Sequence, residues 1–154
     1  METKILPDAA AVTQTAAEEF VDSAGRSEGL AVAMAGGTTP RSLYALLAER
    51  SGISWNKIHF FWSDERHVPP DHHDSNYRMA HEALLSKIPV PAENIHRIKT
   101  ENPNAQQAAE DYGGVLKSFF RLKPSEFPRF DLILLGMGPD GRSEERRVGK
   151  ECRL

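Results

Sequence analysis

The chain has 154 residues, of which 40% are hydrophobic and 27% are charged, a composition that fits one globular domain and excludes the disordered and fibrous classes. The formal net charge of -3 lacks the excess of Lys and Arg that binding along a nucleic acid requires. No apolar run approaches the roughly 20 residues that cross a bilayer, and the N-terminus has no signal-peptide pattern. We therefore expect a cytoplasmic protein with neither nucleic-acid nor membrane partners.

Segments with helical and strand-like patterns alternate along residues 1–141. In chain order, the patterns first predict a helix over 9–23, a buried strand over 30–35, a helix starting near Pro40 and ending before Gly52, and a strand over 58–62. They then predict a helix capped by Ser75 and running to Leu85, and a short strand over 95–98. A long helix from Pro103 to Phe120 and a buried strand over 131–136 follow. This alternation predicts the α/β class, with a parallel, doubly wound, Rossmann-like sheet and flanking helices.

The character of the sequence changes abruptly after Gly141. Residues 142–154 are densely charged and have no apolar periodicity. We expect residues 1–141 to form the N-terminal part of a single α/β domain and residues 142–154 to be a non-native tail. The sheet is then expected to be incomplete at its C-terminal side.

Polar loops follow three of the predicted strands directly, at residues 36–40, 63–67 and 136–141. Because ligands of parallel α/β sheets bind outside the carboxyl ends of the strands, these loops should share one edge. In the first loop, Gly36 and Gly37 allow close backbone approach, Thr38 and Thr39 add hydroxyl groups, and the helix that follows favours an anion such as phosphate. A tight turn without a ligand explains the same residues.

The second loop places carboxylates and cations side by side. Arg66 can bind a phosphate with two hydrogen bonds, and Asp64 can hold a sugar hydroxyl, position a water or orient a histidine. A surface turn of ion pairs remains the alternative. In the third loop, Gly136 and Gly138 again bring backbone amides near a ligand, and Asp140 can cap a following helix, unless the segment is a plain Pro-Asp-Gly turn.

A histidine pair forms the one metal-like pattern of the sequence. His72 and His73 lie between Asp71 and Asp74. Adjacent residues rarely converge on one ion, and two prolines before the pair indicate a loop. The prediction is therefore that no metal binds.

Four segments together resemble the 6-phosphogluconolactonase family, within the superfamily that also contains glucosamine-6-phosphate isomerases. They are, in order, AGGTTP at 35–40, WSDERHVP at 62–69, SN at 75–76 and DLILLGMGPDG at 131–141. The resemblance implies hydrolysis of 6-phospho-D-glucono-1,5-lactone to 6-phosphogluconate in the pentose phosphate pathway, without metal or organic cofactor. It implies substrate binding by the following residues: Gly36, Gly37, Thr38, Thr39, Arg66, Gly136 and Gly138.

The resemblance places the family's general-base histidine at the position of Arg142. A guanidinium stays protonated near neutral pH and cannot accept a proton from water. No catalytic residue is therefore retained with certainty, Asp64 and Asp140 keep candidate supporting roles, and we expect this chain to be inactive. Residues 142–154 also resemble translated sequencing adapter, which is the basis for calling the tail non-native.

Two other interpretations stay open. A glucosamine-6-phosphate deaminase or another sugar-phosphate isomerase shares the first glycine loop and the pair Asp64-Glu65. In that relative an aromatic residue usually follows the pair and a tyrosine follows the later serine, whereas this chain has Arg66 and Asn76. A non-catalytic module that binds sugar phosphates is the third interpretation, and Arg142 is compatible with it.

Overall fold

Four parallel strands form the central sheet of the protein. The computed structural model describes residues 3–136, and it contains β1 (Leu30–Met34), β2 (Ile58–Trp62), β3 (Ile95–His96) and β4 (Leu132–Ile133). The strand order is β3-β2-β1-β4, and all three pairings are parallel. The predicted α/β class with a parallel sheet is confirmed.

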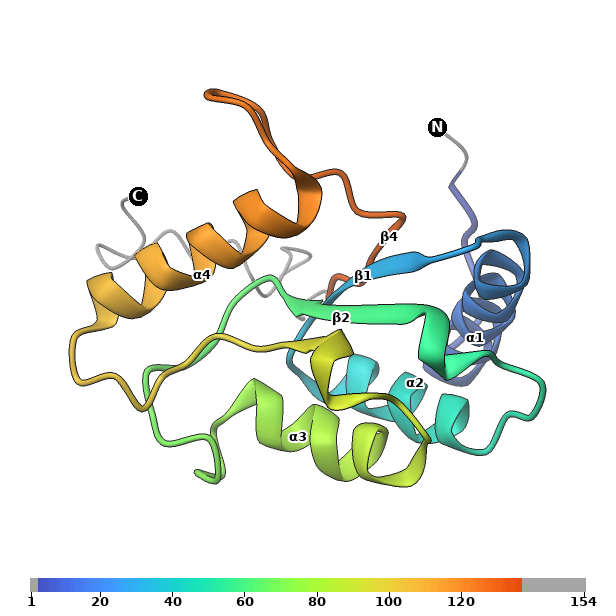
Figure 1. The fold of residues 1–154 in the computed structure, drawn as a ribbon. Coiled ribbons are helices and arrows are strands. Elements are labelled where there is room, and N and C mark those ends of the chain that lie inside the picture. The colour runs from blue at the N-terminus through green and yellow to red at the C-terminus, as the bar shows by residue number, and fades with distance from the viewer. Residues whose placement is uncertain (1–2, 137–154) are drawn as a thin grey trace.

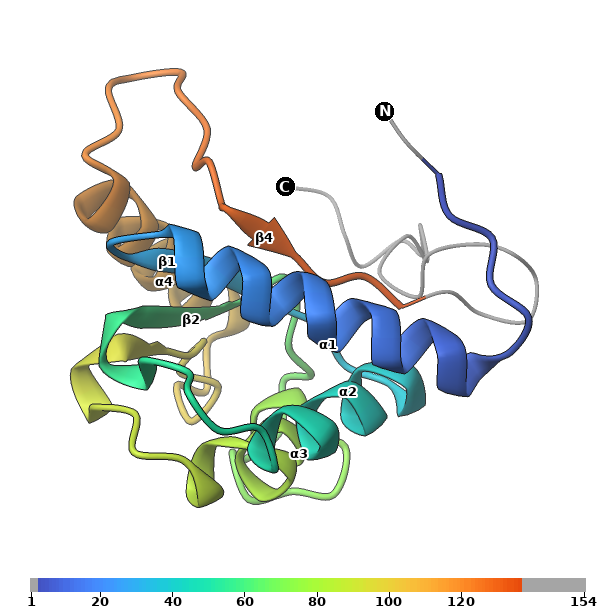
Figure 2. The same ribbon diagram turned by 90° about the vertical axis from the view of Figure 1, so that its right-hand side faces the viewer.

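Helices cover both faces of this sheet. They are α1 (Ala9–Arg26), α2 (Thr38–Ala48), α3 (Asn76–Ala83) and α4 (Ala105–Phe120), with short 3-10 turns at Trp55–Lys57, Leu85–Lys87 and Ala92–Asn94. Helices α1, α2 and α3 lie on one face and α4 lies on the other (Figures 1 and 2). None of the helices among residues 3–136 combines the length and the apolar character that spanning a bilayer requires.

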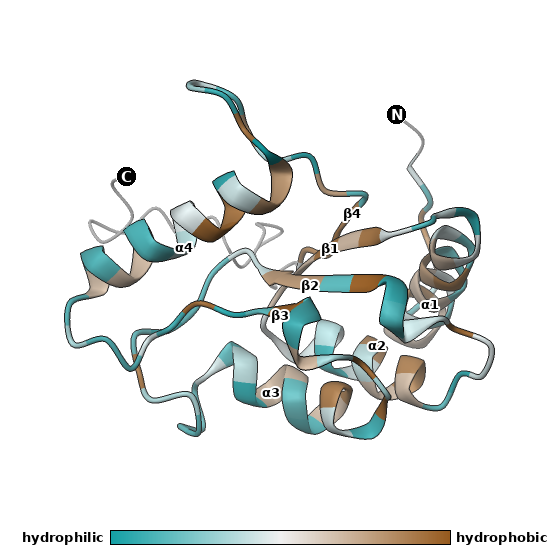
Figure 3. Ribbon diagram, in the orientation of Figure 1, coloured by the Kyte–Doolittle hydropathy of each residue, from teal (hydrophilic) through white to brown (hydrophobic). Residues whose placement is uncertain are grey.

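The two faces of each central strand bury different side chains, as the alternation of a strand dictates. On the face that carries α1 to α3, Val32 and Phe60 pack with Phe20 and Tyr44 in the main core. On the α4 face, the centroids of the Phe61 and Phe119 rings lie 4.9 Å apart. Figure 3 shows hydrophobic residues along the central strands and hydrophilic ones over much of the outer side of α4.

Several predicted boundaries differ from the structure. Helix α1 continues past Gly25 to Arg26, because one glycine in a last turn costs only about 1 kcal/mol. Helix α2 begins at Thr38, so Pro40 lies inside its first turn.

A further difference concerns the strand predicted over 131–136, which is reduced to two residues. The prediction that this strand is buried was wrong, since Ile133 is 54% and Leu135 is 59% exposed. Among residues 3–136, β4 pairs with β1 alone.

The strand order reverses between β1 and β4. From β1 the chain continues to β2 and then to β3, each strand adding to the same side of the sheet. Helix α4 then returns the chain to the other side of β1, where β4 pairs. Such a reversal opens a crevice at the carboxyl ends of the two strands, where doubly wound proteins bind their ligands. The loops that follow β1 and β2 begin at this edge of the sheet.

Candidate functional site

Tyrosine hydroxyls hold the carboxyl ends of the two central strands. The Tyr44 hydroxyl, from α2, accepts a hydrogen bond from the Ala35 N–H (3.0 Å) and donates to the Ala35 carbonyl (2.9 Å). The Tyr112 hydroxyl, from α4, does the same for the N–H (2.8 Å) and carbonyl (3.0 Å) of Trp62. Both strands therefore enter their loops with their last backbone groups satisfied from opposite faces of the sheet.

The first loop is a tight turn into α2. Gly37 precedes the helix with φ of 99°, a left-handed conformation that favours glycine. Thr38 and Thr39 form the exposed first residues of α2, so the positive end of the helix dipole lies at the surface of the described part of the chain. This arrangement suits a phosphate or another anion.

The carboxylate of Glu65 in the second loop caps helix α3. It accepts hydrogen bonds from the backbone N–H groups of Asn76 (2.7 Å) and Tyr77 (2.8 Å) and from the Ser75 hydroxyl (3.1 Å). The N–H of Arg66 donates to the same carboxylate at 2.8 Å. Negative charge at a helix N-terminus is stabilising, so Glu65 fixes the position of α3 relative to β2 and is already fully engaged.

Asn76 connects the first loop with the second. Its Nδ2 donates to the carbonyl oxygen (3.2 Å) and to Oδ1 (3.1 Å) of Asp64. The same amide fills the space beside Gly36, where a Cβ would overlap Asn76 Oδ1 and lie 2.6 Å from its Cγ. Gly36 is thus required by the approach of Asn76, which differs from the predicted close approach of a ligand.

Arg66 and the second oxygen of Asp64 point away from this network. Arg66 Nε lies 4.0 Å from Asp64 Oδ2, and the side chains are 62% and 40% exposed. An ion pair this exposed contributes at most about 1 kcal/mol to stability. The guanidinium is therefore accessible to an anionic ligand at the edge where the loops after β1 and β2 leave the sheet.

The third loop is described only at its start. The Leu134 N–H donates to the Ala33 carbonyl at 2.9 Å, which carries the chain alongside β1 as far as the buried Gly136. The other predicted site residues of this segment, Gly138, Asp140 and Arg142, lie outside the described residues, as does the tail.

The histidine pair lies closer together than its sequence suggested. Ligand atoms of His72, His73 and Asp74 all fall within 4.8 Å of one another. However, Nδ1 of His72 already accepts a hydrogen bond from the Asp74 N–H at 3.2 Å, and the group is largely exposed. That no metal binds there stays a prediction.

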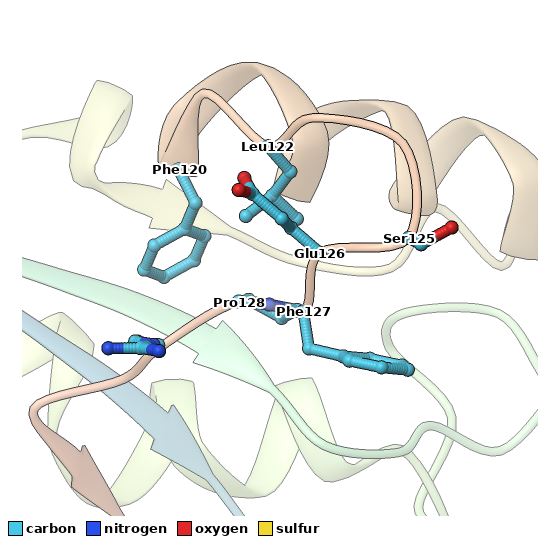
Figure 4. A pocket seen from close by; sticks show the side chains of 7 residues that line it. Phe120, Leu122, Ser125, Glu126, Phe127 and Pro128 are labelled. Atoms are coloured by element: carbon cyan, nitrogen blue, oxygen red, sulfur yellow. The ribbon is translucent and has the colours of Figure 1, made fainter.

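A pocket of about 520 Å³ lies between the end of α4 and the segment that leads to β4 (Figure 4). It contains no residue of the three loops and offers one carboxylate and one guanidinium as charged groups. Its lining residues are Phe120, Leu122, Ser125, Glu126, Phe127, Pro128 and Arg129. We assign the pocket no role in the site.

The sequence did not predict the roles of several site residues. Nothing in the spacing of Tyr44 or Tyr112 distinguishes them from ordinary core residues of a helix. The cap by Glu65 leaves a weak sequence signal, because a carboxylate after a strand precedes a Ser-Asn helix start by ten residues. Such capping over a loop is visible only in three dimensions.

Comparisons with known proteins agree with this geometry. Residues 4–142 match the family model described as glucosamine-6-phosphate isomerases/6-phosphogluconolactonase. A 6-phosphogluconolactonase of Nostoc sp. is 41% identical over 144 residues, covering 91% of this chain and 60% of the relative. One from Synechocystis sp. is 47% identical over 112 residues, or 73% of this chain and 46% of the relative.

A solved structure supports the same assignment. The 6-phosphogluconolactonase of Thermotoga maritima superposes with a TM-score of 0.76 at 36% identity, over 91% of this chain and 61% of that protein. The chain thus spans about 60% of the length of two of these relatives. The match of the family model over nearly the whole sequence means that the chain belongs to the family of glucosamine-6-phosphate isomerases and 6-phosphogluconolactonases.

Proposed function

We propose that this chain carries the substrate-binding edge of an enzyme that hydrolyses 6-phospho-D-glucono-1,5-lactone to 6-phosphogluconate, as a cytoplasmic step of the pentose phosphate pathway, and that with Arg142 in place of the general base it does not itself turn the lactone over. The observation that carries the proposal is the exposed helix start at Gly37 to Thr39, which Asn76 links to the loop that carries Asp64 and the largely exposed guanidinium of Arg66. A phosphorylated sugar needs such a cationic and hydrogen-bonding edge. The names of the relatives from Nostoc and Thermotoga support the same substrate.

In this proposal the phosphate and the reacting carbonyl are held by different groups. The amides at the start of α2 and the Arg66 guanidinium bind the phosphate, and Gly136 and Gly138 are the further substrate-binding residues that the family resemblance implies. Asp64 faces the sugar ring, where its free oxygen can hold a hydroxyl or a water. Holding the lactone in one orientation is itself a large part of catalysis.

A non-catalytic role in binding sugar phosphates is the second candidate, and Arg142 is the observation that favours it. An arginine cannot act as the general base that activates water. Asn76 and Arg66, which occupy positions where a deaminase usually has aromatic residues, count against an isomerase. Sequencing the source gene across codon 142 tests whether the arginine is genuine.

The experiment that separates these candidates compares two proteins. The 154-residue chain is expected to bind 6-phosphogluconate in a calorimetric titration without hydrolysing the lactone. A chimera of residues 1–141 with the C-terminal part of the Nostoc relative is expected to hydrolyse it. A chimera that binds but does not turn over would favour the non-catalytic module, and absence of binding by both proteins would overturn the proposal.

The contribution of Arg66 is tested by Arg66→Ala. Loss of a charged hydrogen bond to phosphate should weaken 6-phosphogluconate binding by tenfold or more, on the order of 1.5–3 kcal/mol, and should raise KM more than it lowers kcat in the chimera. Arg26→Ala, at the far end of α1 in an exposed pair with Asp22, is the matched control and should leave affinity unchanged. Equal affinities of the Arg66 variant and the parent would remove Arg66 from the site.

A further inference from the structure

Asp64 is held at one oxygen and open at the other. Asn76 Nδ2 lies 3.1 Å from Asp64 Oδ1, whereas Oδ2 has Arg66 Nε at 4.0 Å and the side chain is 40% exposed. A carboxylate on a loop would otherwise rotate about its side-chain bonds. One hydrogen bond from a fixed donor therefore fixes the orientation of the Asp64 carboxylate, with its other oxygen toward the edge of the sheet.

Asn76 is a fixed donor because three contacts determine its place. It is 6% exposed, and it is the first residue of α3, whose N-terminus is capped by Glu65. Its amide also bonds to the Asp64 carbonyl at 3.2 Å and fills the space left by the missing side chain of Gly36. A larger residue at position 36 would displace the amide from Asp64.

We propose that Asn76 is a positioning residue of this site, which holds the Asp64 carboxylate in one orientation beside the Gly36–Thr39 turn. The part of the proposal that concerns ligand binding rests on the proposed function, since Asp64 must face the substrate. Asn76 itself is buried behind Asp64 and acts through it. Gly36 is part of the same device, because its missing side chain makes room for the amide.

The packing of Asn76 against Gly36 is tested by a double-mutant cycle in the full chain. Gly36 has no left-handed φ, so an alanine there causes no backbone strain. Gly36→Ala therefore tests only whether the added methyl group collides with Asn76. Unfolding in urea is followed by tryptophan fluorescence. We expect Gly36→Ala to lower the urea midpoint strongly when Asn76 is present and much less in the Asn76→Ala background. If the effects of the two substitutions on the urea midpoint are additive, Gly36 and Asn76 do not pack against each other, and the proposal is overturned.

The action through Asp64 is tested by a second cycle, read as affinity for 6-phosphogluconate. Asn76→Ala should weaken binding by about tenfold, and it should have no further effect once Asp64→Ala is present. A purely structural role predicts the same loss in both backgrounds, and that result would overturn the proposal.

Asn94 provides the matched control. It is 5% exposed, and its Nδ2 donates two backbone hydrogen bonds, to Asn56 (3.0 Å) and Ile58 (3.1 Å), at the opposite end of β2. Asn94→Ala should lower the urea midpoint about as much as Asn76→Ala while leaving affinity unchanged. A comparable affinity loss in Asn94→Ala would mean that instability, not positioning, explains the Asn76 result.

A spectroscopic measurement separates failure of this proposal from failure of the proposed function. If neither the unaltered chain nor the chimera binds 6-phosphogluconate, the proposed function fails, and the NMR signals of the Asn76 side-chain amide decide the positioning role. They should shift in Asp64→Ala if the amide donates to that carboxylate. Unchanged signals would overturn the proposal.

Discussion

Buried and partly buried polar side chains around the site bond to the backbone of neighbouring elements. Tyr44 and Tyr112 each satisfy both backbone groups of a residue at a strand end, and Glu65 satisfies the start of α3. A buried backbone group left without a partner costs free energy comparable to a lost hydrogen bond. These side chains therefore let the strands end abruptly and the loops begin at defined positions.

Tyr112→Phe should be destabilising although it removes a single oxygen. Burial raises the pKa of Tyr112 to about 12, so the hydroxyl keeps its proton and remains a donor. Its loss leaves the N–H and carbonyl of Trp62 without this partner, and the free energy of unfolding should fall by about 1–3 kcal/mol in urea titrations.

The control for this prediction is Tyr77→Phe. Tyr77 keeps its ring contacts with Trp62 and Arg97 in that variant, and no hydrogen bond of its hydroxyl is found among residues 3–136. Its unfolding free energy should change little. If the free energy of unfolding falls equally in the two variants, the hydrogen bonds between the Tyr112 hydroxyl and the Trp62 backbone do not stabilise the protein as predicted.

At the scale of elements, an aromatic cluster attaches α4 to the sheet. Phe119 of α4 packs on the rings of His59 (4.8 Å), Phe61 (4.9 Å) and His96 (5.2 Å), which come from β2 and β3. Nδ1 of His59 and Nε2 of His96 are 3.1 Å apart, so one ring must donate and the other accept. Two protonated rings are incompatible with this contact, because both nitrogens would then be donors.

Stability should consequently depend on pH through this cluster. Burial lowers the pKa of His59, and burial together with the charge of His59 lowers the pKa of His96, both from an ordinary value of 6.5. Below pH 6.5 the unfolded chain therefore binds more protons than the folded one. The stability contribution is fully present above pH 6.5 and is lost as the pH falls toward the lowered folded-state values.

The measurement is the urea midpoint between about pH 7.5 and pH 5.5, the range in which histidines titrate. We expect His96→Gln to flatten the dependence, while His73→Gln, at an exposed position, preserves it. A profile that stays equally steep in both variants would assign the pH dependence to other groups.

On the scale of the whole molecule, apolar surface gathers at the β4 side. Ile133 and Leu135 are 54% and 59% exposed, and Phe127 before them is 83% exposed. An edge strand with free backbone groups and apolar side chains favours pairing with another chain.

We expect the chain to self-associate as its concentration rises, and Ile133→Lys or Leu135→Lys to reduce this association. Charge on an edge strand opposes strand pairing. Sedimentation velocity over a range of concentrations measures the effect. Val12→Lys, which changes an apolar residue of α1 that is 40% exposed, is the control, and an equal reduction in that variant would show a general effect of charge.

Local patterns in the sequence determined most of the elements. The run at 58–62 became β2 at its predicted bounds, and Ser75 caps α3 as its side chain predicts. These features depend on neighbours in the chain, such as apolar runs, caps and glycine turns. The same patterns correctly placed the loops after β1 and β2 at one edge of the sheet, because parallel strands end together.

Only the tertiary structure decided what the polar residues of those loops do. Asp64 and Glu65 are adjacent carboxylates in the sequence, yet one accepts a hydrogen bond from the Asn76 side chain and the other caps a helix. Gly36 suggested a ligand, whereas the space beside it belongs to Asn76. The exposure of Ile133 likewise depends on which strands lie beside β4. Each of these outcomes is a contact between segments distant in the chain, and local patterns carry no information about such contacts.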